Sequence, residues 1–166
     1  ALLIREELEG VKLSIPGLVI DALSSMIGKR EAKEGLIISN DPSGLVTKAN
    51  FQIPLEIEYT LKTDSQVRFK FAADQIIFNW EKDPNELRID GGPVSGQHKK
   101  ELGTLPINQL VTIKQIILPE EMLIFVNGKE RARWSGDFQN VNQPIGICGA
   151  NGSTLSLKQI VVRKPK

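Results

Sequence analysis

Polar and apolar residues alternate with a period of two along most of the chain. From Leu36 onward, short runs rich in β-branched and aromatic residues are separated by turn-forming residues. This pattern is typical of an antiparallel sandwich or barrel, whose strands bury one face and leave the other solvated. It predicts strands at residues 35–39, 44–50, 54–62, 66–72, 75–81, 86–90, 109–118, 121–127, 129–134, 144–150 and 153–163.

The first 34 residues give a less regular pattern. Residues 11–15 alternate like a strand, and residues 18–27 fit either a pair of strands or a short helix. The charged stretch 28–35 is predicted to be a solvated loop. We therefore expect one domain over residues 1–166, in which residues 1–34 form edge strands or a lid.

Four strands between residues 54 and 90 are predicted to form one antiparallel meander. Short loops would place Tyr59 opposite Phe69, and Phe69 opposite Phe78, so that apolar side chains meet at every joint. Because a slip of one residue would turn a strand over, this agreement favours the register. The opposite face would carry a polar row made of Thr60, Arg68, Asn79 and Arg88, with Lys70 and Glu81 beside it.

Several segments resemble the concanavalin A-like lectin/glucanase superfamily, in particular its laminin-G-like modules. The strongest hairpin signal is Asn127-Gly128, which suits a type I′ turn and follows a hydrophobic strand. The resemblance covers roughly residues 36–163 and implies an all-β, two-sheet antiparallel jelly-roll sandwich whose last strand returns beside the first. It implies less about function, because the superfamily includes lectins, glycoside hydrolases and adhesion modules. The segments that carry it are 77–81, 86–89, 111–114, 122–130, 135–138 and 152–162.

Composition excludes several classes of function. The 21 basic and 20 acidic residues leave a net charge of +1, which argues against a nucleic-acid partner. No apolar run approaches the roughly 18 residues of a membrane span, and no signal peptide is visible at the start of the chain. The single cysteine, Cys148, rules out an intramolecular disulfide. It fits a reducing compartment, with the cytoplasm preferred, and it also fits a secreted bacterial protein with one free thiol.

The sequence predicts no metal site and no cofactor. With one cysteine and one histidine, His98, a Cys/His zinc site is excluded by count. A calcium site of carboxylates and carbonyls stays open, because Asp41, Asp90 and Asp137 lie near turns, but no EF-hand spacing marks one. His98 is expected in a surface loop, and Cys148 is expected to be a small buried residue.

Catalytic motifs are weak on the predicted strands. Retaining glucanases of the superfamily carry a Glu-x-Asp-x-x-Glu strand whose outer carboxylates flank the scissile bond. The nearest match, in 55–60, has Glu56 and Glu58 but lacks the other carboxylates at that spacing, so the hydrolase motif is predicted to be absent. The glycine-rich segment 91–96 does not lead from a strand into a helix, so it is not a phosphate loop. We therefore predict a protein that is not an enzyme.

The polar row is the best candidate for a binding site. Arginine and asparagine present planar donors and acceptors that match vicinal hydroxyls. We predict a non-catalytic, lectin-like module that binds carbohydrate. The alternatives are a structural or protein-interaction module that associates through an exposed strand such as 109–118, and, as a third reading, a glycoside hydrolase. Both tryptophans, Trp80 and Trp134, are expected in the core. A plain solvated sheet face is the competing interpretation of the row Thr60, Arg68, Asn79, Arg88, Lys70 and Glu81.

Overall fold

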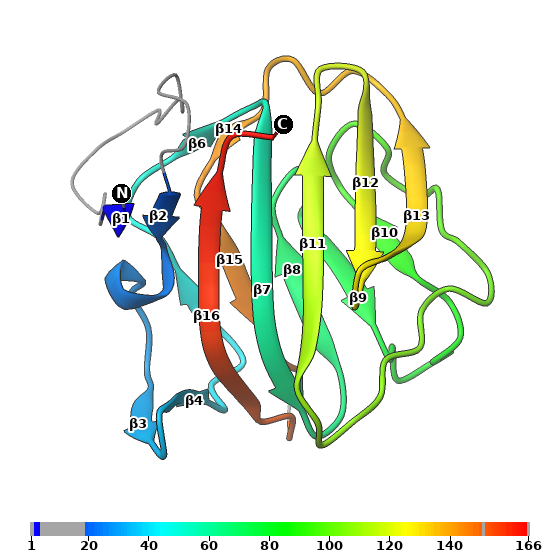
Figure 1. Ribbon diagram of the computed structural model, residues 1–166. Helices are drawn as coiled ribbons and strands as arrows, with labels where there is room; N and C mark the ends of the chain where they lie inside the picture. Colours follow the sequence, from blue (N-terminus) through cyan, green and yellow to red (C-terminus); the bar gives the residue numbers. More distant parts are fainter. Residues whose placement is uncertain (1, 4–18, 151, 166) are drawn as a thin grey trace.

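The computed structural model describes residues 2–3, 19–150 and 152–165, and β-strands make up nearly all of its regular structure (Figure 1). One 3-10 turn, η1 (Leu23–Ser25), follows the second strand. The strand predicted at residues 11–15 lies outside the described residues. Among those described, no helical segment is long and apolar enough to span a membrane.

Nine described strands form the larger sheet. Its central strands, β7 and β11, pair antiparallel over seven residues, so that Tyr59 lies opposite Ile113. The last strand, β16, lies between β7 and β2, as the resemblance implied. In spatial order the strands are β1 (Leu2–Leu3), β2 (Val19–Asp21), β16 (Leu155–Arg163), β7 (Leu55–Thr63), β11 (Val111–Ile117), β12 (Glu121–Val126) and β13 (Lys129–Ser135), while β4 (Leu36–Ser39) pairs with β16 and β3 (Glu31–Lys33) with β4.

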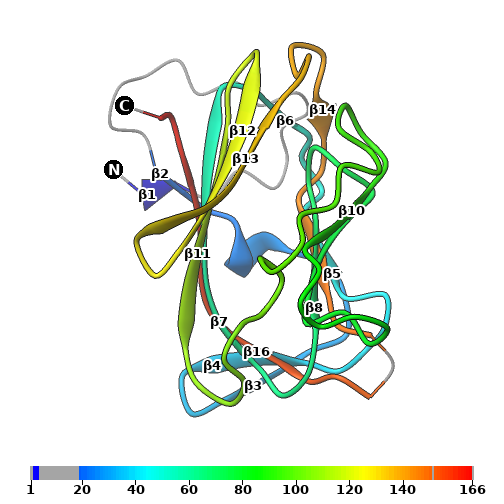
Figure 2. The same ribbon diagram turned by 90° about the vertical axis from the view of Figure 1, so that its right-hand side faces the viewer.

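The smaller sheet has five described strands and covers the inner face of the larger one, so that the molecule has two layers (Figure 2). Its spatial order is β10 (Arg88–Asp90), β9 (Gln75–Phe78), β8 (Val67–Lys70), β15 (Gly146–Cys148) and β5 (Leu45–Val46), and a separate pair is formed by β6 (Phe51–Gln52) and β14 (Asn142–Gln143). Every strand predicted from residue 35 onward is present, although several are shorter than predicted.

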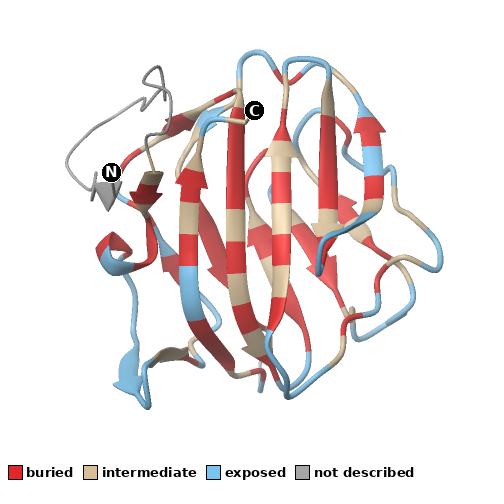
Figure 3. Cartoon of the chain, in the orientation of Figure 1, coloured by how far each residue is buried: buried red, intermediate tan, exposed pale blue. Residues whose placement is uncertain are grey.

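The hydrophobic core fills the space between the layers. The bands of buried and partly exposed residues along each strand follow the period of two (Figure 3). The rings of Tyr59 and Phe69 lie 4.5 Å apart, and those of Phe69 and Phe78 lie 5.9 Å apart in an edge-to-face arrangement. Trp134 is also fully buried, as predicted, and its indole N–H donates to the Gln97 carbonyl.

The predicted four-stranded meander is wrong at its first joint. Strand β7 pairs with β11 and β16, whereas β8 belongs to the other sheet. The turn after Thr63 therefore crosses between layers, and Tyr59 meets Phe69 across the sandwich. Both strands direct their apolar residues into the same core, so alternation alone cannot separate a hairpin from a crossover.

The other two strand pairs of the meander, β8 with β9 and β9 with β10, form as predicted, but their register differs from the predicted one by two residues. Arg68 lies opposite Ile77 instead of Asn79, and Arg88 also lies opposite Ile77. A shift of two preserves which face each residue occupies. The turns accompany these shifts: residues 71–74, with Ala72 at a φ of 58°, connect β8 to β9, and Asn79, with a φ of 57°, follows the end of β9 at Phe78.

Two further turn predictions have different outcomes. Asn127-Gly128 forms the β12–β13 hairpin, with Val126 opposite Lys129 and positive φ at both turn residues. The charged stretch 28–35 is exposed as expected, but it contains β3, which pairs with β4. Strand β2 extends the larger sheet beside β16, and β1 pairs with β2 and ends the sheet on that side.

Candidate functional site

The outer face of β8, β9 and β10 gathers most of the predicted polar residues. Because side chains alternate along a strand, the residues that point away from the core form two rows across this face. Register places Arg68, Ile77 and Arg88 in one row. The parallel row consists of Lys70, Gln75 and Asp90.

Ile77 is an apolar residue on this outward face. It is 1% exposed although it does not belong to the core cluster between the sheets. Its neighbours on the adjacent strands are Arg68 and Arg88, whose aliphatic stems can cover an apolar side chain while the guanidinium groups stay hydrated. Ile77 is therefore shielded from water and packs between the aliphatic stems of the two arginines.

Arg68 lies at the centre of a hydrogen-bond network. Its Nε donates to Gln66 Oε1 at 3.0 Å, and one terminal nitrogen donates to Gln75 Oε1 at 3.0 Å. The other terminal nitrogen lies 3.4 Å from Glu81 Oε2, which also accepts from the Gln66 amide at 2.7 Å. These partners come from β8, β9 and the turns beside them, so the guanidinium is held flat across the sheet.

The network continues through Gln75 to β10. The Gln75 amide donates to Asp90 Oδ2 at 2.8 Å, and Arg88 Nε donates to the same oxygen at 3.0 Å. Arg88 also lies 3.6 Å from Glu86 Oε2. A continuous chain of side chains thus links Glu81 to Glu86 across three strands. The polar-row prediction missed Gln66 and Gln75, although the outward position of Gln75 follows from the same alternation.

Trp80 lies on this face, and the prediction that it belongs to the core is wrong. The ring is half-buried, and the Arg88 guanidinium carbon lies 4.3 Å from its centroid. The left-handed conformation of Asn79 interrupts the alternation after Phe78, so Trp80 no longer follows the inward positions of β9. A tryptophan therefore borders the polar network.

Asn79 does not present its amide to solvent as predicted. Its Oδ1 accepts from the Leu105 backbone N–H at 2.8 Å, and its Nδ2 donates to the carbonyls of Leu105 and Ser65. The side chain fastens the loop before β11 to the end of β9. Asn79 is thus a structural clamp, and its hydrogen-bonding groups are already used.

Thr60 lies on the other sheet, so its predicted place in the polar row is wrong. It belongs to β7 and pairs with Thr112 of β11 and Gln159 of β16. Its outward side faces away from the smaller sheet, and it cannot share a site with Arg68. Of the predicted residues, the structure brings together Arg68, Lys70, Arg88 and Glu81.

The carboxylates of the network are held in their ionised form. Hydrogen bonding by the Gln66 amide lowers the pKa of Glu81 below its ordinary value. Burial raises the pKa of Asp90, but the hydrogen bonds from Gln75 and Arg88 outweigh this effect, and the pKa lies below its ordinary value. Both groups therefore act as acceptors at neutral pH.

The letters Glu-x-Asp-x-x-Glu do occur in the sequence, at Glu81, Asp83 and Glu86. The prediction that this motif is absent is therefore wrong as to the letters, which lie in the turn between β9 and β10. Asp83 N–H donates to the Trp80 carbonyl, and Asp83 Oδ1 accepts from the Asn85 N–H. Asp83 therefore closes the turn, and the three carboxylates do not alternate along one strand.

The remaining candidate groups have structural roles. His98 Nδ1 accepts the Ile89 N–H at 3.0 Å, so the histidine supports β10 and is not a free surface side chain. Cys148 is buried as predicted, and burial raises the pKa of its thiol. Asp41 accepts from Ser43 N–H and Asp137 from Gln139 N–H within their own turns. No group of three potential metal-ligating side chains occurs among the described residues.

Comparison of the sequence with models of known families, and with curated proteins, finds no match. Solved structures do match. A β-glucanase from Bacillus licheniformis superposes with a TM-score of 0.63 at 13% identity, covering 86% of this chain and 83% of the other. The Caenorhabditis elegans galectin LEC-6 gives 0.53 at 12% identity, covering 81% and 94%.

The chain has the concanavalin A-like jelly-roll fold. A third solved structure, the carbohydrate recognition domain of Emp47p, gives a TM-score of 0.56 at 12% identity and covers 85% of this chain and 88% of the other. At these identities the likeness establishes the concanavalin A-like fold and no shared site. The fold predicted from the sequence is thereby confirmed.

Proposed function

We propose that this chain is a non-catalytic carbohydrate-binding module whose site is the outer face of β8, β9 and β10. The residues that we propose to contact sugar are Arg68, Lys70, Arg88 and Glu81, and their neighbours Gln75, Asp90 and Trp80 complete the proposed site.

The continuous network on this face is the observation that supports the proposal. A sugar hydroxyl both donates and accepts, and the network offers guanidinium and amide donors beside carboxylate acceptors within one plane. The partners already fix each side chain, so little entropy would be lost on binding. Trp80 adds a partly exposed ring at the border of the network; Arg88 covers one face of this ring, and the rest would supply apolar contact to a sugar.

The fold comparison adds support of a weaker kind. A galectin and a carbohydrate recognition domain are both among the structural neighbours. The network of this chain lies on one face of a sheet, where an extended oligosaccharide could lie across several strands.

Glycoside hydrolysis is the second candidate function. It is favoured by the β-glucanase neighbour and by the spacing of Glu81, Asp83 and Glu86. A hydrolase needs a carboxylic acid whose pKa is raised so that it can protonate the leaving group. Glu81 instead has a lowered pKa, and Asp83 is bonded within its turn. These observations favour binding without hydrolysis.

A glycan-array assay tests the binding proposal. Wild type should bind a defined set of glycans, and Arg68→Ala should lose that binding while its circular dichroism spectrum is unchanged. Arg133→Ala is the matched control, because Arg133 also pairs with two carboxylates but lies on the larger sheet. A wild type that binds no glycan would favour the protein-interaction module instead.

Incubation with mixed-linkage β-glucan separates the two candidates. If wild type released reducing sugar and Glu81→Gln or Glu86→Gln abolished the release, the chain would be a hydrolase. Binding to the glucan without any release of reducing sugar is the expected result.

A further inference from the structure

The outer face of the larger sheet carries a hollow that the carbohydrate proposal does not use. It has a volume of about 600 Å³ and lies over β7, β11, β12 and β16. A smaller hollow of about 290 Å³ adjoins it, since both are lined by Lys114 and Ile116. Together they make one depression on the side of the molecule opposite the polar network.

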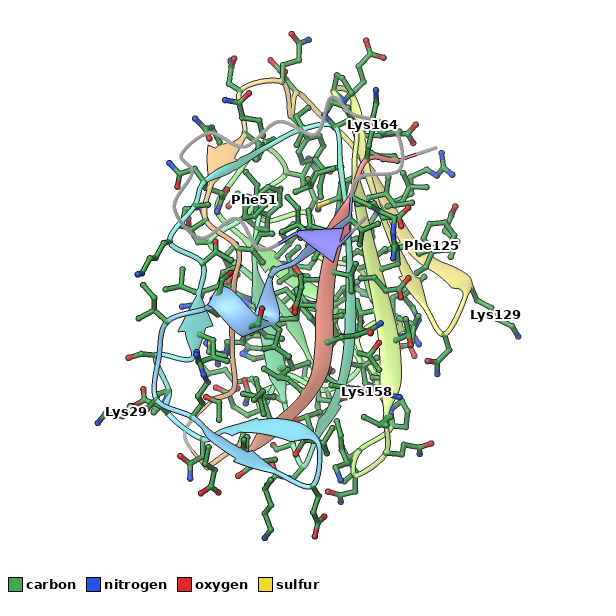
Figure 4. The ribbon with its side chains drawn as sticks, turned by 60° about the vertical axis from the view of Figure 1, so that its left-hand side comes forward. Lys29, Phe51, Phe125, Lys129, Lys158 and Lys164 are labelled. Carbon is green, nitrogen blue, oxygen red and sulfur yellow. The ribbon has the colours of Figure 1, made fainter. Side chains whose placement is uncertain are left out.

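The floor of this depression is apolar. Ile116 and Leu118 come from β11 and the residue after it, Leu123 from β12, and Phe125 lines the smaller hollow. These are outward positions, where a solvated sheet face normally carries polar residues. Leu123 is only 8% exposed although it lies outside the core cluster. Figure 4 shows Phe125 and Lys164 on this same outer side of the sheet.

The two arginines on the walls of the depression are engaged in ion pairs. Arg163 lies 2.7 Å from Glu56 and 3.3 Å from Glu58. Arg133 lies 2.7 Å from Glu121, and it also pairs with a carboxylate on β13. Each arginine is held by two carboxylates, so each of these clusters has one carboxylate in excess, and neither arginine is free to attract an anion.

Lys114, at the centre of the depression, differs from these arginines because it has no ion-pair partner among the described residues. Register places it opposite Glu58, but the Glu58 carboxylate is paired with Arg163. Lys114 is half-buried and forms no ion pair with any carboxylate of the described residues. Lys164, at the rim, forms none within that same part of the chain. Lys114 therefore presents an ammonium group without a direct ion-pair partner in the described part of the chain, next to an apolar floor.

We propose that this depression binds a small anionic amphiphile, namely a carboxylate with an aliphatic or aromatic body. The anionic head would pair with Lys114, and the apolar body would cover Ile116, Leu123 and Phe125. The volume falls within the range of small-molecule sites, about 300–1,000 Å³. A flat protein surface would have to desolvate the paired arginines as well, which costs free energy, whereas a small ligand need meet only the floor and Lys114.

Isothermal titration with dodecanoate, below its micelle concentration, tests the proposal. Wild type should bind at sub-millimolar concentration, and dodecyldimethylamine oxide, which has the same chain but no net charge and no sugar, should bind about tenfold more weakly or not at all. Lys114→Gln should weaken dodecanoate binding about tenfold. Lys33→Gln, in the exposed strand β3, is the matched control and should bind as wild type does.

A second variant tests the floor. Ile116→Thr keeps a β-branched residue in the strand, so folding should persist while the affinity for dodecanoate falls. The absence of binding by wild type at millimolar dodecanoate, or equal binding by Lys114→Gln, would overturn the proposal. Sedimentation of wild type as a dimer that Ile116→Lys dissociates would also overturn it, by assigning the face to a second copy. Because the two sites lie on opposite sheets, Arg68→Ala should leave dodecanoate binding unchanged.

Discussion

The guanidinium group of Arg88 lies over the indole ring of Trp80, with 4.3 Å between its central carbon and the ring centroid. The same guanidinium bonds Asp90 and approaches Glu86, so the arginine joins the aromatic ring to the polar network. A sugar that packs on Trp80 would also lie within reach of these donors and acceptors. This arrangement links aromatic packing with hydrogen bonding in one site.

Trp80 should report binding at this site. The chain has two tryptophans, and Trp134 is 1% exposed, so a soluble quencher should reach only Trp80. We expect acrylamide to quench part of the emission of wild type and almost none of that of Trp80→Phe. A bound glycan should protect the quenched fraction. Quenching that glycan leaves unchanged, under conditions where the array shows binding, would place the sugar elsewhere.

Asn79 should matter for stability and not for ligand contact. Replacing it with alanine removes hydrogen bonds to Leu105 and Ser65 and leaves a residue with a Cβ in a left-handed backbone. We expect Asn79→Ala to lose about 2–3 kcal/mol of unfolding free energy in urea. Asn79→Gly should lose less, because glycine tolerates positive φ. Full stability of Asn79→Ala combined with lost glycan binding would instead make Asn79 a ligand residue.

The fold could be predicted from the sequence because each strand buries one face. Period-two alternation marks Val67 and Phe69 as inward and Arg68 as outward, and the structure agrees. Alternation does not say which strand is the neighbour. Strands β7 and β8 direct Tyr59 and Phe69 into the same core from opposite layers, so the predicted hairpin and the observed crossover produce the same pattern.

The site could be predicted only in part, because the positive φ of Asn79 interrupts the alternation of side chains along the strand. Arg68, Lys70 and Arg88 point outward as alternation predicts. Trp80 comes directly after Asn79 and lies on the outer face, where alternation would have placed it in the core. Asparagine is among the few non-glycine residues that adopt this conformation readily, so the sequence permits the change without specifying it.

Asp90 should make the protein less stable in acid. Its folded pKa is lowered, so its contribution is fully present above its unfolded pKa of about 4 and is lost as the pH falls through the lower folded value. The carboxylate is partly exposed, so the contribution should stay under about 1 kcal/mol. Urea unfolding of wild type and Asp90→Asn between neutral pH and pH 2 measures it. The two curves should converge at the acid end, and a constant gap would show that charge is not the cause.

Tyr59 should remain protonated until the protein unfolds. It is the only tyrosine in the chain and is fully buried, and burial raises the pKa of its phenol far above its ordinary value. Its hydroxyl donates to Gln115 Oε1 at 3.0 Å, and the Gln115 amide donates to the Phe71 carbonyl at 2.9 Å. The phenol thus belongs to a buried chain of hydrogen bonds that connects the two layers.

Two measurements follow from this burial. Because the folded pKa exceeds the unfolded one, the stability due to Tyr59 is complete below the unfolded pKa, about 10, and falls by about 1.4 kcal/mol per pH unit above it. Tyrosinate absorbance should therefore appear together with loss of circular dichroism, and not before. Tyr59→Phe should flatten this alkaline slope, yet cost about 1–3 kcal/mol at neutral pH because Gln115 Oε1 loses its donor. Tyrosinate absorbance near pH 10 in a folded protein would show that water reaches the phenol and that the two layers are less tightly packed there.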